Sequence, residues 1–280
     1  MTEILESHRV HGGRLSYCRH ESDATATPMR FSLFEPPGQG PFPYLVWLSG
    51  LTCTEENFTT KSGAYAAAAE HGLGIVAPDT SPRGPGIPDD PAYDLGQGAA
   101  FYLDATEPPW APWYQMERYV TRDLPAALDG FPLDHHRRGI FGHSMGGHGA
   151  LTLALRRPDL FRSVSAFAPI ASPARCAWGE KAFSAYLGHD RRRWREHDAC
   201  FLIEAGAGKG AFDEILVDQG ESDPFLSDQL KPELLESACR AVGQPLRLRL
   251  QPGYDHSYFF IATFIAEHIG WHAVRLGVTP

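Results

Sequence analysis

The chain has 280 residues, of which 43% are hydrophobic and 21% charged, a composition typical of a folded globular protein rather than a disordered one. Its length suits one large α/β domain or two small ones. The formal net charge of -9 and the isoelectric point near 5.8 argue against nucleic acid or an anionic membrane as a general partner, because the overall field repels polyanions.

The first predicted elements mark a change from a half-buried strand to a fully buried one. Apolar and polar side chains alternate over residues 29–34, which lie between Pro28 and Pro36, and this pattern predicts an antiparallel strand. Residues 44–49 are almost continuously apolar, as expected of a strand covered on both faces. A parallel sheet with helices on both faces is therefore expected from residue 44 onward.

Helices and strands then alternate along the rest of the chain. Helices are predicted at 61–70, 117–128, 145–157, 232–242 and 257–275. Strands are predicted at 74–77, 138–141, 163–167, 214–217 and 246–250. Long irregular segments within 81–119 and a helical insertion at 174–200 interrupt the alternation. Because no linker or internal repeat appears, we expect residues 1–280 to form a single α/β domain.

Two further features restrict the class of protein. The five cysteines form no CxxC pair and no zinc-like spacing with histidine, so free thiols are expected. No apolar stretch is long enough to cross a bilayer, and the polar start at residues 1–8 is unlike a signal peptide, so we expect a cytoplasmic location. The basic run Arg191–Arg195 is expected to be a solvated helix face with Trp194 packed inward.

A Gly-x-Ser-x-Gly pattern at residues 142–146 has Ser144 at its centre. This nucleophile elbow is a strained turn between a strand and a helix, where side chains two positions before and after the serine would collide with the backbone. The apolar strand at 138–141 leads into the pattern, and a helix rich in small residues follows it. We therefore predict that Ser144 is a nucleophile, at a helix N-terminus that favours a negative oxyanion.

A serine hydroxyl requires a general base, and in α/β-hydrolases the acid and the histidine follow the serine in the chain. The downstream histidines are His189, His197, His256, His268 and His272. Of these, His256 lies between a predicted strand and a predicted helix, at the carboxyl edge of the sheet where active sites assemble. We predict that His256 is the base.

Three carboxylates follow the strand at 214–217 and compete to orient His256. Asp218 lies almost on the strand, where it is placed to cap the turn at Gly220, and Glu221 is expected to be solvated. Asp223 lies further out, from where it can reach back to the histidine. The residues alone favour Asp223 over Asp218 but leave both open.

An oxyanion hole is expected from two backbone N–H groups. One belongs to Met145, directly after the nucleophile, and the other to a loop after an earlier strand, for which we expect Leu51. Cys53 in the same loop is expected to be a structural thiol.

Several segments of the chain resemble the S-formylglutathione hydrolase family, also called esterase D. These segments are 48–58, 76–84, 98–107, 142–150, 178–183, 218–220 and 253–258. They occur in the family's order over most of the chain, whereas residues 1–26 and the run Arg191–Arg195 differ from it.

The resemblance implies an α/β-hydrolase fold with a mostly parallel sheet, no metal or organic cofactor, and a cytoplasmic, commonly homodimeric enzyme. The implied reaction hydrolyses S-formylglutathione to formate and glutathione in formaldehyde detoxification. The resemblance also implies the triad Ser144, Asp223 and His256, and so selects Asp223 as the acid. It further implies that Cys53 and Trp178 lie near the acyl pocket.

Three other functions are alternatives to this one. A broad carboxylesterase and an acyltransferase that passes the acyl group to an alcohol would use the same scaffold and triad. A non-catalytic binding protein on a hydrolase scaffold is disfavoured because Ser144, Asp223 and His256 are all present.

Overall fold

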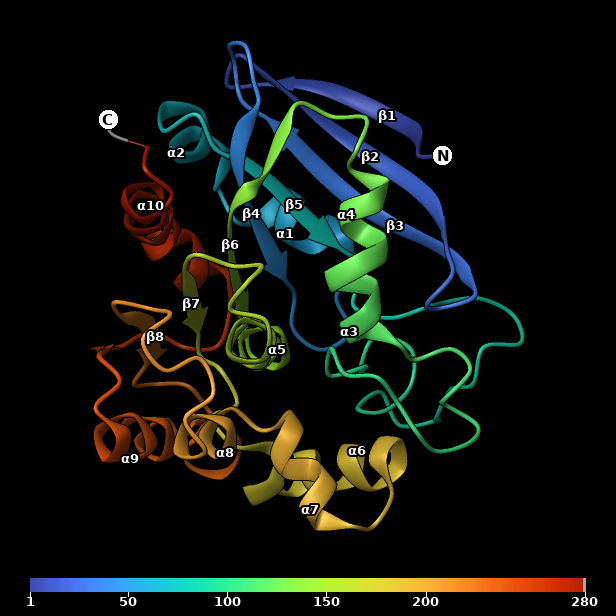
Figure 1. Cartoon of the computed structure of the whole chain (residues 1–280), viewed down its shortest axis with the longest axis vertical. Coiled ribbons are helices and arrows are strands. Elements are labelled where there is room, and N and C mark those ends of the chain that lie inside the picture. The colour runs from blue at the N-terminus through green and yellow to red at the C-terminus, as the bar shows by residue number, and fades with distance from the viewer. Residues whose placement is uncertain (279–280) are drawn as a thin grey trace.

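The computed structural model describes residues 1–278, and a nine-stranded sheet runs through it in the order β1-β2-β3-β5-β4-β6-β7-β8-β9 (Figure 1). The strands are β1 Glu3–Val10, β2 Gly13–Ser22, β3 Thr27–Glu35, β4 Phe42–Leu48, β5 Gly74–Pro78, β6 Leu133–His143, β7 Val164–Phe167, β8 Ile215–Gly220 and β9 Leu246–Gln251. From β1 to β5 each neighbouring pair is antiparallel, and from β5 through β4 to β9 each pair is parallel. The predicted mostly parallel sheet is confirmed.

Helices cover both faces of this sheet (Figure 1). They are α1 Glu55–Lys61, α2 Tyr65–Glu70, α3 Met116–Arg118, α4 Leu124–Ala127, α5 Met145–Arg156, α6 Ala177–Leu187, α7 Arg191–Trp194, α8 Ala199–Glu204, α9 Pro232–Val242 and α10 Tyr258–Arg275. On one face α5 packs on β6 and β7, with α8 against α5 and α9 against α8. On the other face α10 packs on β7 and α2, and α1 packs on β3 and β5. The predicted helical insertion after β7 contains α6 and α7 and ends as α8 begins.

The N-terminal hairpin of β1 and β2 was not predicted from the sequence. Nearly all of β1 is exposed, so its residues carry no alternation between a buried and an exposed face. The hairpin turns at His11 and Gly12, which have φ of 47° and 80°.

The helix predicted at 61–70 is instead two short helices. The first, α1, begins earlier than expected because Thr54 and Asn57 form a capping box, in which Asn57 Oδ1 accepts a hydrogen bond from Thr54 N at 2.9 Å. Gly63, with φ of 67°, then separates α1 from α2. The helix predicted at 117–128 is confirmed as the continuous run of α3, a π-helical segment at Tyr119–Asp123 and α4.

The centre of the core lies under the middle of the parallel sheet. Every residue of β4 is buried, and Trp47 stacks on Phe58 at a centroid distance of 4.3 Å and meets Phe141 edge-on at 4.9 Å. Aromatic burial of this kind stabilises the strands that carry the site. Because the carboxyl ends of parallel strands lie at one edge, the loops after β4, β6, β8 and β9 meet there.

Candidate active site

Ser144 lies between β6 and α5 on a sharp, strained turn. Its φ of 58° and ψ of -119° are unusual for a residue with a side chain, and its N–H donates to Phe167 O at 3.0 Å. A Cβ on Gly142 would lie 2.3 Å from Gly146 O, and one on Gly146 would lie 2.0 Å from Leu48 O. Both glycines are therefore required, and the strand-turn-helix setting predicted for Ser144 is present.

His256 lies in the loop between β9 and α10 and contacts Asp223. Because a carboxylate only accepts, His256 Nδ1 donates its hydrogen to Asp223 Oδ2, at 2.5 Å. The Asp223 carboxylate is fully buried and also accepts from Phe225 N at 2.8 Å and from Gln219 Nε2 at 3.2 Å. With Nδ1 protonated, the neutral imidazole keeps a lone pair on Nε2, which is the form that a general base needs.

Ser144 and His256 line the same cavity, which has a volume of about 420 Å³. Within residues 1–278 Ser144 Oγ makes no hydrogen bond to His256. A nucleophile and its base can form this hydrogen bond only as the substrate binds, so its absence does not contradict the predicted roles.

The two predicted oxyanion donors lie close to Ser144. Leu51 lines the cavity, and a Cβ on its neighbour Gly50 would lie 3.3 Å from Ser144 Cβ. Met145 is the first residue of α5, so its N–H has no partner within the helix. Neither N–H donates a hydrogen bond elsewhere in the described part of the chain, so both remain available to a substrate oxygen.

Cys53 and Trp178, the predicted pocket residues, both line this cavity. Trp178 Nε1 donates to Asp94 O at 2.5 Å, and its ring packs on Phe101 at a centroid distance of 4.8 Å. Burial raises the pKa of the Cys53 thiol, so the thiolate is disfavoured there.

The other two carboxylates considered for the acid lie elsewhere. Asp218 is buried on β8 and forms an ion pair with Arg249 rather than a cap on the turn at Gly220. Glu221 is exposed, as expected. Asp223 is thus the carboxylate of the three that contacts His256.

Three residues of the cavity that the sequence did not single out have a buried polar atom with no hydrogen-bond partner among residues 1–278. These atoms are His143 Nε2, Gln229 Oε1 and Tyr258 Oη. The ring of His143 lies 4.3 Å from that of His256, and burial, with the neighbouring His256, holds the pKa of His143 well below 6.5. His143 and Tyr258 lie beside Ser144 and His256 in the sequence, which could have indicated them, whereas Gln229 has no such signal.

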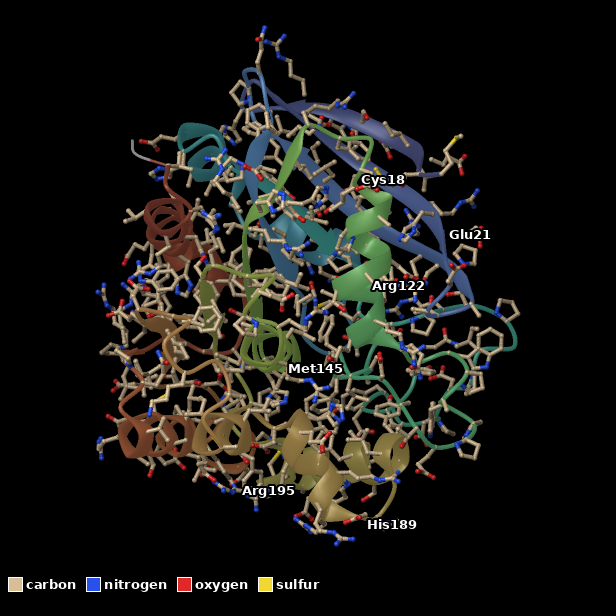
Figure 2. The ribbon with its side chains drawn as sticks, viewed as in Figure 1. Cys18, Glu21, Arg122, Met145, His189 and Arg195 are labelled. Atoms are coloured by element: carbon tan, nitrogen blue, oxygen red, sulfur yellow. The ribbon has the colours of Figure 1, made fainter. Side chains whose placement is uncertain are left out.

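The basic run Arg191–Arg195 forms the short solvated helix α7 and the residue after it, and it contributes no lining residue to this cavity. Trp194 is buried, while Arg191 pairs with Glu180 at 2.6 Å and Arg192 with Asp190 at 3.0 Å. Figure 2 shows Arg195 toward the lower edge of the molecule, whereas Met145 lies in the middle. The run has the structural role that was expected.

No helix in residues 1–278 is both long and apolar enough to cross a membrane. The same residues contain no group of three or more His, Cys, Asp or Glu side chains arranged to hold a metal ion.

The chain is similar to known esterases over nearly its whole length. The esterase family, described as "Putative esterase", matches residues 22–271. A relative from Paracoccus denitrificans (strain Pd 1222), named S-formylglutathione hydrolase, is 54% identical over 278 residues, which are 98% of each chain. A solved S-formylglutathione hydrolase from Agrobacterium tumefaciens is 47% identical with a TM-score of 0.95, and the match covers 98% of this chain and 99% of that one.

A more distant solved structure shares the fold alone. This is a fluorophosphonate-binding serine hydrolase of Staphylococcus aureus, which is 19% identical with a TM-score of 0.75 over 93% of this chain and 98% of that one. The fold and the family predicted from the sequence are confirmed. The chain is a serine hydrolase with the α/β-hydrolase fold and belongs to the S-formylglutathione hydrolase family.

Proposed function

We propose that this enzyme hydrolyses S-formylglutathione to formate and glutathione, with Ser144 as nucleophile, His256 as general base and Asp223 as the residue that orients His256. The observation that carries this proposal is the 54% identity to the Paracoccus denitrificans S-formylglutathione hydrolase over 98% of both chains. The 2.5 Å contact between His256 and Asp223, beside the cavity that Ser144 lines, supports it.

In the acylation step, Ser144 Oγ attacks the formyl carbon while its proton passes to His256 Nε2. The carbonyl oxygen becomes an oxyanion, which accepts hydrogen bonds from the N–H groups of Leu51 and Met145. Collapse of this intermediate breaks the C–S bond and releases glutathione as its thiolate, leaving formyl-Ser144. A thiol with a pKa of about 8.5 is a good leaving group, so the thiolate needs little help from the proton on His256.

In the deacylation step, His256 returns to its neutral form by giving its proton to the thiolate or to solvent. It then takes a proton from a water molecule whose oxygen attacks the formyl ester. The second tetrahedral intermediate uses the same two N–H groups, and its collapse breaks the bond from the formyl carbon to Ser144 Oγ. As this bond breaks, His256 returns its proton to Ser144 Oγ, and the product leaves as formic acid, which loses its remaining acidic proton to water to give formate.

The experiment that tests the substrate compares kcat/KM for S-formylglutathione, S-acetylglutathione and 4-nitrophenyl acetate in the wild type and in Ser144→Ala. We expect S-formylglutathione to give the highest value and Ser144→Ala to lose at least about 10⁴-fold on all three substrates. A wide margin in favour of the aryl ester would identify a broad carboxylesterase instead. Faster turnover with an added alcohol, together with its ester as product, would identify an acyltransferase.

The same experiment needs a count of the active sites and a check on the identity of the nucleophile. An organophosphonate that labels the active serine counts the competent sites, and Ser144→Ala should not be labelled at all. If Ser144→Ala kept full activity, the assignment of the nucleophile would be wrong whatever the substrate.

We further propose that the enzyme is a cytoplasmic homodimer of single-domain subunits and takes part in formaldehyde detoxification without a metal or organic cofactor. The family resemblance supports these statements. Light scattering on the purified protein should give twice the mass of the 30.9 kDa chain, and dialysis against a chelator should leave its activity unchanged. One cooperative unfolding transition is expected of a single domain.

A further inference from the structure

The loop after β4 makes a tight turn that sets the direction of the Leu51 N–H. Cys53 N–H donates to Gly50 O at 3.3 Å, which closes a four-residue turn with Leu51 and Thr52 at its centre. The peptide between Gly50 and Leu51 is trans, so its oxygen and its N–H point in opposite directions. Because the oxygen bonds within the turn, the Leu51 N–H is directed out of the turn.

Thr52 holds this turn in a strained conformation. Its φ of 66° lies in the left-handed region, which a β-branched residue rarely adopts. The turn thus persists only if neighbouring segments restrain it. One restraint is the hydrogen bond from Thr52 N to Gly98 O at 2.9 Å, where the backbones lie so close that a Cβ on Gly98 would be 3.0 Å from Thr52 Cα.

The second restraint acts on the last residue of the turn and comes from the loop after β5. The carbonyl oxygen of Cys53 accepts two hydrogen bonds, from Thr80 Oγ1 at 2.6 Å and from Arg83 Nη2 at 2.9 Å. Arg83 Nη2 also lies 3.3 Å from Thr80 Oγ1, so the two donors are held together. Both lone pairs of the Cys53 carbonyl are therefore occupied by side chains from one loop.

A buried carboxylate fixes the guanidinium that holds Cys53. Arg83 Nε lies 3.0 Å from Asp79 Oδ1 and 2.9 Å from Oδ2, and Asp79 is buried. Thr80 N–H also donates to Asp79 Oδ1, at 2.6 Å. A charge-assisted contact of this kind restricts the orientation of the Arg83 side chain, leaving Nη2 for the Cys53 carbonyl. Neither Arg83 nor Thr80 is among the residues that line the catalytic cavity.

We propose that Arg83 and Thr80 are positioning residues of the oxyanion hole. By holding the Cys53 carbonyl they keep the strained turn closed, and the closed turn keeps the Leu51 N–H directed at the oxyanion. They act on the transition state and not on substrate affinity, because the hydrogen bond to Leu51 strengthens as charge develops on the oxygen. The inference rests on the proposed acyl-transfer chemistry of Ser144 but not on the identity of the thioester.

The test uses two pairs of variants. Thr80→Val removes the hydroxyl that contacts Cys53 with almost no change of shape. Thr80→Ser keeps the hydroxyl and removes only the methyl group. Arg83→Gln removes the charge and the contact with Asp79, whereas Arg83→Lys keeps the charge. For each variant kcat and KM are measured with S-formylglutathione and with 4-nitrophenyl acetate, and kcat is expressed per serine labelled by an organophosphonate.

Removing an oxyanion donor outright lowers kcat by about 10²- to 10³-fold, and loosening one should cost part of that. We expect Thr80→Val and Arg83→Gln to lower kcat by about 10- to 100-fold on both substrates, with KM changed by less than about threefold. Thr80→Ser should recover most of the loss. A trifluoromethyl ketone that forms a tetrahedral adduct with Ser144 should lose affinity in proportion to kcat/KM.

Arg192→Gln is the matched control. Arg192 also makes a two-point contact with an aspartate, from Nε and Nη2 to Asp190 at 3.0 Å each, but on the exposed surface. The Arg192→Gln variant should leave kcat and KM unchanged for both substrates. The proposal is overturned if Thr80→Val and Arg83→Gln keep kcat per labelled serine within about threefold of wild type, or if they raise KM alone. Because the aryl ester reports the same oxyanion, this result stays separate from failure of the substrate assignment.

Discussion

Asp218 and Arg249 face each other across the neighbouring strands β8 and β9. Arg249 Nη2 donates to Asp218 Oδ2 at 2.5 Å and Nε donates to Oδ1 at 2.6 Å, and the two residues are directly paired in the strand register. His268 Nε2 lies 3.2 Å from the same Oδ2. The Asp218 carboxylate is thus fully engaged in the fold, while Asp223 contacts His256.

This division of roles predicts different defects for the two asparagine variants. Asp223→Asn should lower kcat by about 10³- to 10⁴-fold, because the amide cannot hold the required tautomer of His256 or stabilise its positive charge. Asp218→Asn should keep kcat within about tenfold but lower the free energy of unfolding by about 3 kcal/mol, because it leaves Arg249 without its buried partner. Steady-state kinetics and urea unfolding of both variants check this, and the opposite ranking would contradict the assignment.

Much of the central sheet and part of the site are local in the sequence and could be predicted from it. The run of apolar residues in β4 reports burial on both faces, and the glycines at 142 and 146 report the crowding around Ser144. His256 was identifiable because it follows a strand at the carboxyl edge of the sheet. In each case the residues that allow the prediction belong to the same short segment as the structural feature that they predict.

Contacts between distant segments could not be predicted in the same way. The pairing of Asp218 with Arg249 depends on the register of two strands that are far apart in the chain, and the restraint on Cys53 depends on how the loops after β4 and β5 meet. The strand β1 could not be predicted for another reason. It is exposed and buries no face, so its residues show no alternation between buried and exposed positions. The two long-range contacts, by contrast, are fixed by tertiary packing rather than by local propensity.

The glycines of the elbow provide a stability prediction with an internal control. In Gly146→Ala the new Cβ would lie 2.0 Å from Leu48 O and 2.4 Å from Ser49 O, a collision with backbone that no side-chain movement relieves. We expect the free energy of unfolding to fall by about 3 kcal/mol or more. Most of the enzyme activity in the soluble fraction should therefore be lost.

Gly130→Ala is the matched substitution, because a Cβ at Gly130 meets nothing within 4 Å. It should change the free energy of unfolding by no more than about 1 kcal/mol. Thermal and urea unfolding of the two variants give the comparison. Equal effects would mean that the close approach of α5 to β4 is not what requires glycine at position 146.

Buried histidines predict the direction of the pH dependence of stability. Burial lowers the pKa of His143 and His272 well below 6.5, and it lowers that of His268 as well, although Asp218 opposes this shift. The unfolded chain binds protons near pH 6.5 that the folded chain does not, so these groups destabilise the folded state as the pH falls below about 6.5.

The free energy of unfolding should therefore be greatest above about pH 6.5 and fall as the pH is lowered toward about 5.5. Each histidine that stays neutral in the folded state contributes up to about 1.4 kcal/mol per pH unit. Urea titrations at several pH values measure this slope, and a constant m-value checks that the unfolding remains two-state. Stability that is flat or rises over this range would show that the folded protein accepts these protons.

We predict that Lys61, which lies near Tyr258, attracts the carboxylates of the glutathione leaving group. Its Nζ lies 5.8 Å from the ring centroid of Tyr258, which lines the cavity, and within residues 1–278 Lys61 makes no salt bridge. Glutathione carries carboxylates, and an exposed charge at this range is worth up to about 1 kcal/mol. Lys61→Gln should therefore raise KM for S-formylglutathione by about threefold to fivefold and leave kcat unchanged. KM and kcat for the neutral 4-nitrophenyl acetate should not change. Added salt should reduce the difference between wild type and variant.

Lys209→Gln, which removes an exposed charge of the same kind elsewhere, should have no effect. A rise in KM that is equal for the neutral ester would show that Lys61 supports the shape of the cavity and does not attract the charge of its substrate.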